Sequence, residues 1–197
     1  MPTDAAEPES LSLTAATAAD TTALAATLAT LLRPGDLVGL TGELGAGKTH
    51  FVRGLARGLG LDPRQVSSPT FVLLHEYATP VPSTPGPSPT ALLHLDLYRL
   101  GAAEELDTLG WGDAGAELRE EAVVAVEWAD RFPEAMGDDW LEIELAHSPD
   151  QGRTITLTPH GSWTRRMAAV RQRVPGSGIG SDSAANRAGA DPHRHQP

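Results

Sequence analysis

The sequence predicts an α/β fold, in which a mixed β-sheet lies between helices in a single three-layer domain. Two observations predict it. Segments with apolar residues at helical spacing alternate along the chain with short apolar runs of the kind that form buried strands. The chain also has 197 residues, which is enough for one domain with a substantial hydrophobic core.

The first three elements are predicted by apolar periodicity and by helix-ending residues. Residues 14–36 place four leucines on one helical face, Asp20 or Thr21 is expected to cap the start, and a Pro-Gly pair ends the segment. Residues 36–42 form a short apolar run typical of a buried strand. Residues 49–60 return to helical spacing, so we expect helix, strand and helix in that order.

The middle of the chain predicts two strands separated by a long surface loop. Residues 70–77 and 91–98 have the composition of strands. The loop of residues 78–90 contains five prolines, which a sheet interior does not accept. We therefore expect the two strands to form a hairpin with a long, Pro-rich loop, and one or two short helices to lie within residues 103–121.

The last part of the ordered chain predicts three more strands and then a tail. Residues 122–128 are a nearly continuous apolar run, and residues 140–146 and 153–159 alternate in the strand pattern. The C-terminal residues are first basic and then rich in Gly, Ser and Ala. The predicted division is a domain over residues 1–163 and a basic, disordered tail over residues 164–197.

Charge and composition exclude several classes of protein. Residues 1–163 carry 9 basic against 24 acidic side chains, so this part repels phosphate backbones and is a poor nucleic-acid binder by itself. The absence of cysteine excludes disulfides, thiolate nucleophiles and thiolate zinc sites. Histidines stand singly, which predicts no convergent metal set. No segment has the length of apolar sequence that spans a membrane, and the expected location is cytoplasmic.

The segment "GELGAGKT" at residues 42–49 carries the clearest chemistry. It matches the phosphate-binding loop (P-loop, or Walker A) pattern at every specified position, and it lies between an apolar strand and a periodic helix. Glycines let the backbone wrap a phosphate, and the helix start adds its positive dipole end. Lys48, the only lysine beside 14 arginines, is expected to reach the β and γ phosphates, and Thr49 to bind Mg²⁺.

Two acidic residues at strand ends are candidates for the magnesium site. Asp96 lies near the end of one apolar strand and Glu127 closes another. Ligands of open α/β sheets gather at the carboxyl ends of strands, so both acids are expected near the phosphates. The segment "SSPT" at residues 67–70 is a candidate switch that would sense the γ-phosphate through Thr70, although an ordinary turn uses the same residues.

Several classes of protein share the P-loop, and other residues discriminate between them. A guanine-specific GTPase needs an Asn-Lys-x-Asp loop, but the only asparagine is Asn186 and the only lysine is already in the P-loop. Large motor ATPases need more chain. A small-molecule or nucleoside kinase would need residues 99–113 as a lid, where Arg99 is the only arginine. The remaining class is a small ATPase that drives a conformational or assembly step, with the kinase or a nucleotide-dependent interaction module as alternatives.

Five segments in order resemble the TsaE (YjeE) family: "GELGAGKT", "SSPTFVLLHEY", "HLDLYRL", "EELDTLG" and "VEWADR". The resemblance covers roughly residues 14–160. It implies a P-loop α/β domain that binds ATP and Mg²⁺ and hydrolyses ATP slowly when alone. It also implies action with the TsaD–TsaB pair, which transfers a threonylcarbamoyl group to N6 of adenosine 37 in tRNA. Contact with tRNA is then indirect, through the complex, and no membrane is involved.

The resemblance also assigns roles to residues by position in these segments. Thr70 is expected in the switch loop, Asp96 as a Walker B-like acid, Glu127 as a second magnesium-associated acid beside Trp128, and Arg153 as a contact of the nucleotide base. The residues expected to wrap the phosphates are Leu44, Gly45, Ala46, Gly47, Lys48 and Thr49, and those expected to bind the metal are Thr49, Asp96 and Glu127.

Overall fold

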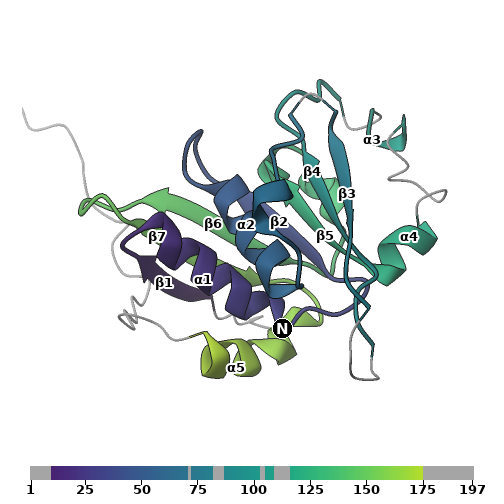
Figure 1. Cartoon of the computed structure of the whole chain (residues 1–197). Coiled ribbons are helices and arrows are strands. Elements are labelled where there is room, and N and C mark those ends of the chain that lie inside the picture. Colours follow the sequence, from purple (N-terminus) through teal and green to yellow (C-terminus); the bar gives the residue numbers. More distant parts are fainter. Residues whose placement is uncertain (1–9, 71, 82–86, 103–104, 109–115, 175–197) are drawn as a thin grey trace, which may run out of the picture.

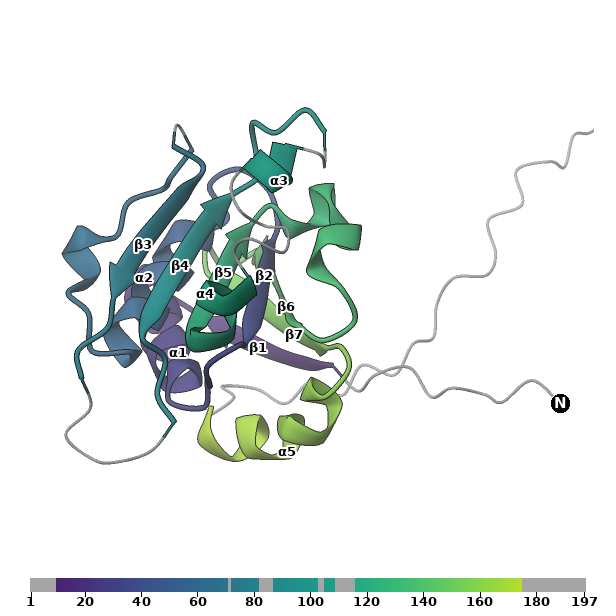
Figure 2. The same cartoon turned by 90° about the vertical axis from the view of Figure 1, so that its right-hand side faces the viewer.

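A seven-stranded mixed sheet forms the centre of the molecule, and helices pack against both of its faces (Figures 1 and 2). This arrangement confirms the predicted fold class. The computed structural model describes residues 10–70, 72–81, 87–102, 105–108 and 116–174. Within these residues no helix is both long enough and apolar enough to cross a membrane.

Four parallel strands make the middle of the sheet, and antiparallel strands complete its edges. The order is β1-β7-β6-β2-β5-β4-β3, in which β6, β2, β5 and β4 are parallel. The chain pairs β3 with β4 as an antiparallel hairpin, as predicted, and β6 with β7 as a second one. The strands are β1 (Leu11–Ala15), β2 (Leu37–Thr41), β3 (Leu74–Ala78), β4 (Ala91–Asp96), β5 (Ala122–Glu127), β6 (Leu141–His147) and β7 (Arg153–Pro159).

Two helices cover one face of the sheet. Helix α1 (Ala18–Ala29) packs closely on α2 (Lys48–Gly58), and both lie in front of the sheet in Figure 1. The approach is close because α2 carries Gly54 at the crossing, where a Cβ would lie 2.5 Å from the Cβ of Ala25. Leucines and valines of α1, α2 and the strands form one continuous core on this side.

Shorter helical segments cover the other face, which Figure 2 shows on the right of the sheet. They pack on a second core built from the alternate residues of β4 and β5, together with Phe132, Met136 and Trp140. The segments are α3 (Glu105–Thr108), α4 (Ala116–Glu121) and two 3₁₀ helices, η3 (Ala129–Arg131) and η4 (Pro133–Met136). A further 3₁₀ helix, η1 (Pro63–Gln65), comes after α2.

The beginning of the chain differs from the prediction. Residues 14 and 15 belong to β1, an edge strand antiparallel to β7, and α1 begins only at Ala18. Thr17 is the N-cap, and Asp20 completes a capping box by accepting from the Thr17 backbone N–H, so the predicted caps are wrong in position. Alternating "LSLTA" is too short to be recognised beside a longer alanine-rich helix.

The end of the described chain also differs from the predicted tail. Helix α5 (Trp163–Arg173) comes after β7 and packs beside α1, with Trp163, Met167 and Val170 buried. The predicted tail includes residues 164–174, but their apolar residues recur at helical spacing and cover the core. The many arginines of this segment lie between those apolar positions. Residues 175–197 lie outside the described residues, as do residues 82–86 of the Pro-rich loop.

Candidate nucleotide-binding site

The P-loop connects β2 to α2 and passes close to β6. Gly42 has φ +123°, and a Cβ at this position would lie 2.2 Å from the carbonyl oxygen of Leu145. Only glycine therefore fits at the start of the loop. The N–H of Phe51 donates to the carbonyl of Gly47 at 2.9 Å, which closes the first turn of α2. No described side chain caps this turn, so its N–H groups are available to an anion.

Lys48 lies inside the loop rather than in solvent. Its side-chain Nζ donates to the carbonyl oxygens of Gly42 at 2.5 Å and Glu43 at 3.0 Å, and it lies over the ring of Trp128. The residue is 5% exposed. Burial lowers the pKa of Lys48 below the ordinary lysine value, while the charge of Glu127 acts in the opposite direction.

Thr49 and Glu127 meet across the gap between α2 and β5. The Thr49 hydroxyl donates to Glu127 Oε1 at 2.8 Å. Side chains alternate between the two faces of a strand, so Val123, Ala125 and Glu127 of β5 all face the side of the sheet that α2 covers. This direction brings the Glu127 carboxylate to Thr49. The same oxygen also contacts His94 Nε2 of β4 at 2.8 Å. Glu127 Oε1 of β5 therefore contacts side chains of both α2 and β4.

Asp96 lies beside Glu127 because β4 and β5 are parallel and pair these two residues in register. Its Oδ2 accepts hydrogen bonds from the hydroxyls of Ser68 at 2.8 Å and Thr70 at 2.5 Å, and its Oδ1 accepts the N–H of Tyr98 at 3.0 Å. The segment of residues 67–70 is thus tied to the end of β4, which places the candidate switch against a candidate metal ligand.

Arg153 comes from the start of β7 and holds the P-loop. Its Nε donates to the carbonyl oxygen of Ala46 at 2.7 Å, and a terminal nitrogen donates to that of Gly45 at 3.3 Å. A second terminal nitrogen donates to the carbonyl oxygen of Gly152 at 2.8 Å. The guanidinium therefore binds backbone carbonyls on two segments, and its contact with a nucleotide base stays a prediction.

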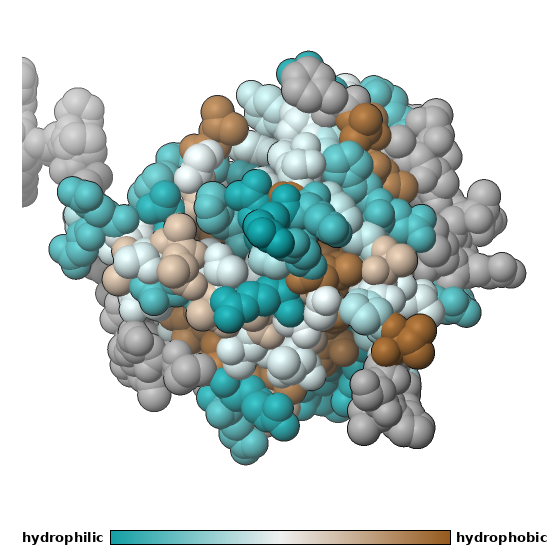
Figure 3. Space-filling model, viewed as in Figure 1, coloured by the Kyte–Doolittle hydropathy of each residue, from teal (hydrophilic) through white to brown (hydrophobic). Residues whose placement is uncertain are grey.

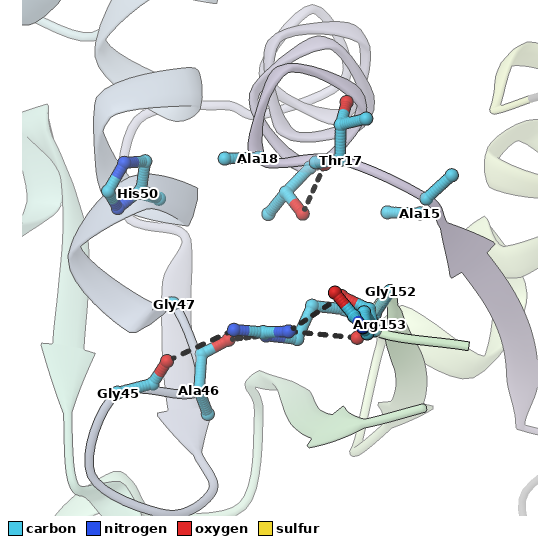
Figure 4. A pocket seen from close by; sticks show the side chains of 12 residues that line it. Ala15, Thr17, Ala18, Gly45, Ala46, Gly47, His50, Gly152 and Arg153 are labelled. Carbon is cyan, nitrogen blue, oxygen red and sulfur yellow. Dashed lines mark hydrogen bonds between the residues drawn. The ribbon is translucent and has the colours of Figure 1, made fainter. Parts of the chain in front are cut away.

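Two adjoining cavities flank the P-loop. The first, of about 220 Å³, lies between the start of α1 and the β6–β7 turn; Figure 4 shows Thr17 and Ala18 on one side and Arg153 on the other. The second, of about 440 Å³, lies on the other side of the loop. Gly45, Gly47 and His50 line both. The second cavity is also lined by Leu44, Lys48, Thr49, Ser68, Thr70, Asp96, Tyr98, Glu127 and Trp128.

Most of the predicted site residues therefore line one cavity. Ala46 and Arg153 instead line the first cavity. The sequence did not identify His94 or Tyr98 as part of the site, and it included Ser68 only as a member of the segment of residues 67–70. His94 could have been found, because it stands two residues before Asp96 and so shares its strand face. The residues 99–113 of a possible kinase lid lie partly outside the described residues.

A profile of the family described as "Threonylcarbamoyl adenosine biosynthesis protein TsaE" matches residues 15–155, which is most of the chain. This chain belongs to the TsaE family. The matched region includes the P-loop, both strand-end acids, the segment of residues 67–70 and Arg153, whereas α5 lies beyond it.

Individual TsaE proteins agree with this assignment. The chain is 40% identical over 149 residues to a tRNA threonylcarbamoyladenosine biosynthesis protein TsaE of Streptomyces coelicolor, covering 73% of this chain and 93% of the relative. It is 37% identical over 143 residues to the protein of the same name in Bacillus subtilis, covering 73% and 82%. The crystal structure of Bacillus subtilis YdiB superposes with a TM-score of 0.61 at 28% identity, covering 82% of this chain and 93% of that one.

Proposed function

We propose that this chain is the ATP-binding and ATP-hydrolysing component of the machinery that makes threonylcarbamoyladenosine at position 37 of tRNA. The names of its TsaE relatives support the pathway. One structural observation supports the chemistry: Lys48, Thr49, Asp96 and Glu127 all line one cavity beside an uncapped helix start. These groups would bind the phosphates and the metal ion of a nucleotide in the same cavity.

The oxygen atoms in this cavity fit Mg²⁺. Among the described residues no group of three or more His, Asp or Glu side chains could hold a metal without other ligands. Mg²⁺ commonly uses one or two carboxylates together with phosphates and water, so Thr49, Glu127 and Asp96 would hold it jointly with a nucleotide. The ion would neutralise charge that develops on the transferred phosphoryl group.

The protein's own residues supply binding and positioning. Lys48 would leave its carbonyl partners and bind the β and γ phosphates, since a compact ammonium with three donors can exchange acceptors without moving the loop. Thr70 would exchange Asp96 for the nucleotide or its metal, and this exchange would report the presence of the γ-phosphate to residues 67–70. Arg153 would keep the carbonyls of Gly45 and Ala46 turned away from the phosphates.

We further propose that hydrolysis acts through partners that resemble TsaD and TsaB, and that tRNA is met only through that complex. Large apolar side chains near the second cavity are exposed, with Leu44 at 76% and Tyr98 at 43%. Much of the remaining surface on the α1 and α2 side is hydrophilic (Figure 3). An apolar rim beside the phosphate cavity supports a protein contact that depends on the bound nucleotide.

Turnover of ATP labelled at the γ-phosphate tests this function. We expect slow release of phosphate by the protein alone, and a changed rate with the purified TsaD-like and TsaB-like partners and tRNA. A kinase would instead transfer the label to a small molecule, and an interaction module would release none in any mixture. Lys48→Ala is expected to abolish release. Arg64→Ala is the matched control, because Arg64 pairs with Asp62 on the exposed surface.

A further inference from the structure

His94 is a buried polar residue to which the proposed function assigns no role. It lies in the middle of β4, is 0% exposed and is paired in register with Ala125 of β5. Its Nε2 is 2.8 Å from Glu127 Oε1, and its Nδ1 has no hydrogen-bond partner among the described residues. Burying an imidazole costs free energy, because one polar atom loses water without replacement. Leucine would fill such a position without this cost.

The hydrogen-bond pattern defines the direction of the contact. A carboxylate oxygen only accepts, so the bond to Glu127 requires the hydrogen on Nε2 of His94. Nδ1 makes no hydrogen bond with any described residue. Glu127 Oε1 receives two hydrogens, one from His94 and one from the hydroxyl of Thr49 at 2.8 Å. A run of three groups therefore connects the interior of the sheet to the first turn of α2.

This arrangement restrains two groups that face the cavity. A glutamate has three side-chain torsions, and fixing them costs conformational entropy that a hydrogen bond can offset. With Oε1 occupied by two donors, Oε2 is the oxygen of Glu127 left for a ligand. The Thr49 hydroxyl points its hydrogen toward Oε1, so its lone pairs are free for a cation. Both consequences depend on where His94 places Oε1.

We propose that His94 is a positioning residue that orients Glu127, and through it Thr49, for Mg²⁺ bound with a nucleotide. The inference rests on the proposed ATP function of this site. Hydrogen-bond partners that orient a metal ligand typically change metal affinity by about 10–100-fold when they are removed. The effect is expected on the metal rather than on the nucleotide, because His94 does not line either cavity.

Three variants separate positioning from packing. His94→Leu keeps the volume but removes the donor, and His94→Gln keeps an amide N–H that can reach Glu127. Leu92→Ala is the matched control for lost packing, because Leu92 is fully buried two residues earlier on the same strand and in the same core. It should lower the melting temperature of the protein without removing a hydrogen bond to Glu127.

The first measurement is the Mg²⁺ concentration that half-saturates ATP binding, read by calorimetry below the melting temperature of each variant. We expect a rise of about 10–100-fold in His94→Leu, a change within about threefold in His94→Gln, and none in Leu92→Ala. ATP affinity in EDTA should stay within about threefold throughout. An unchanged midpoint in His94→Leu, an equal rise in Leu92→Ala, or no rescue by a folded His94→Gln would each overturn the proposal.

The second measurement needs no nucleotide. Imidazole ¹⁵N spectra of the wild type should show one histidine with its hydrogen on Nε2 that exchanges slowly, and His94→Leu should lack that signal. Glu127→Gln should shift it, and an unshifted signal would contradict the contact. If the wild type bound no ATP in the presence of Mg²⁺, the proposed function would fail, while this spectrum would still report on the His94–Glu127 contact separately.

Discussion

Lys48 Nζ lies 3.4 Å from the centroid of the Trp128 ring. The same ammonium donates to the carbonyl oxygens of Gly42 and Glu43, so three partners hold it within the loop. Trp128, the residue after Glu127, has φ 62°, and this left-handed backbone conformation accompanies the position of its ring beside Lys48. A cation over an indole face gains about 0.5–2 kcal/mol. Binding of phosphate would therefore exchange the carbonyl partners of the ammonium for phosphate oxygens.

Lys48→Arg should remove ATP binding although it preserves the charge. The two carbonyls and the indole enclose a compact ammonium, and a planar guanidinium needs more room and a different donor geometry. We expect the dissociation constant for ATP to rise by about 100-fold or more, which corresponds to about 2.8 kcal/mol. Calorimetric titration checks this, and an affinity within tenfold of the wild type would contradict it.

Lys48 should also make stability depend on pH. Because burial lowers its pKa in the folded protein below 10.5, the unfolded chain holds the proton more tightly. The charged lysine therefore costs stability at neutral pH, and the cost disappears as pH rises through the folded pKa toward 10.5. Relative to Lys48→Met, the wild type should gain free energy of unfolding over this window. Urea unfolding of both proteins at pH 8 and pH 10 measures the gap, and a constant gap would contradict the sign.

Arg153→Lys should loosen the P-loop. The guanidinium binds the carbonyls of Ala46 and Gly45 with separate nitrogens, and a lysine cannot reproduce that fork. We expect roughly tenfold weaker ATP binding and a melting temperature lower by about 3 °C, as for the loss of about 1 kcal/mol. Arg64→Lys, at an exposed pair with Asp62, is the control that should leave both unchanged. Equal losses of ATP affinity and melting temperature in the two variants would contradict a specific role of Arg153 in holding the P-loop.

Arg166 of α5 should contribute strongly to stability. It forms two hydrogen bonds with the buried carboxylate of Asp36, at 2.6 and 2.7 Å, and a third with the Leu31 carbonyl at 2.8 Å. Arg166→Met leaves Asp36 buried without its partner, which should cost about 3 kcal/mol in the free energy of unfolding.

A double-mutant cycle separates the ion pair from the packing of α5. Adding Asp36→Asn to Arg166→Met should recover part of the loss, because no unpaired charge then remains. Denaturant unfolding of the four proteins gives the coupling energy. A coupling near zero would mean that the arginine acts through its contacts with the Leu31 carbonyl and with Trp163, over whose ring it lies at 3.7 Å.

The sequence by itself determined the central fold and the location of the P-loop. Buried parallel strands are apolar on both faces, so β2 and β5 appear as nearly continuous apolar runs, and β4 as one interrupted by His94. The P-loop is equally local, because its glycines, lysine and threonine act through the eight consecutive residues 42–49. Asp96 and Glu127 are recognisable because a carboxylate at the end of an apolar strand has few structural reasons to be there.

Only the tertiary structure decided which distant side chains meet. Arg153 binds carbonyls of the P-loop from more than 100 residues away, and His94 of β4 reaches Glu127 of the neighbouring strand β5. Likewise, the arginine-rich sequence of α5 does not indicate which core residues its buried apolar side chains contact. A local sequence pattern indicates whether a segment is buried or exposed to water. Hydrogen bonds between side chains of different strands depend on strand register and side-chain direction, which only the folded sheet determines.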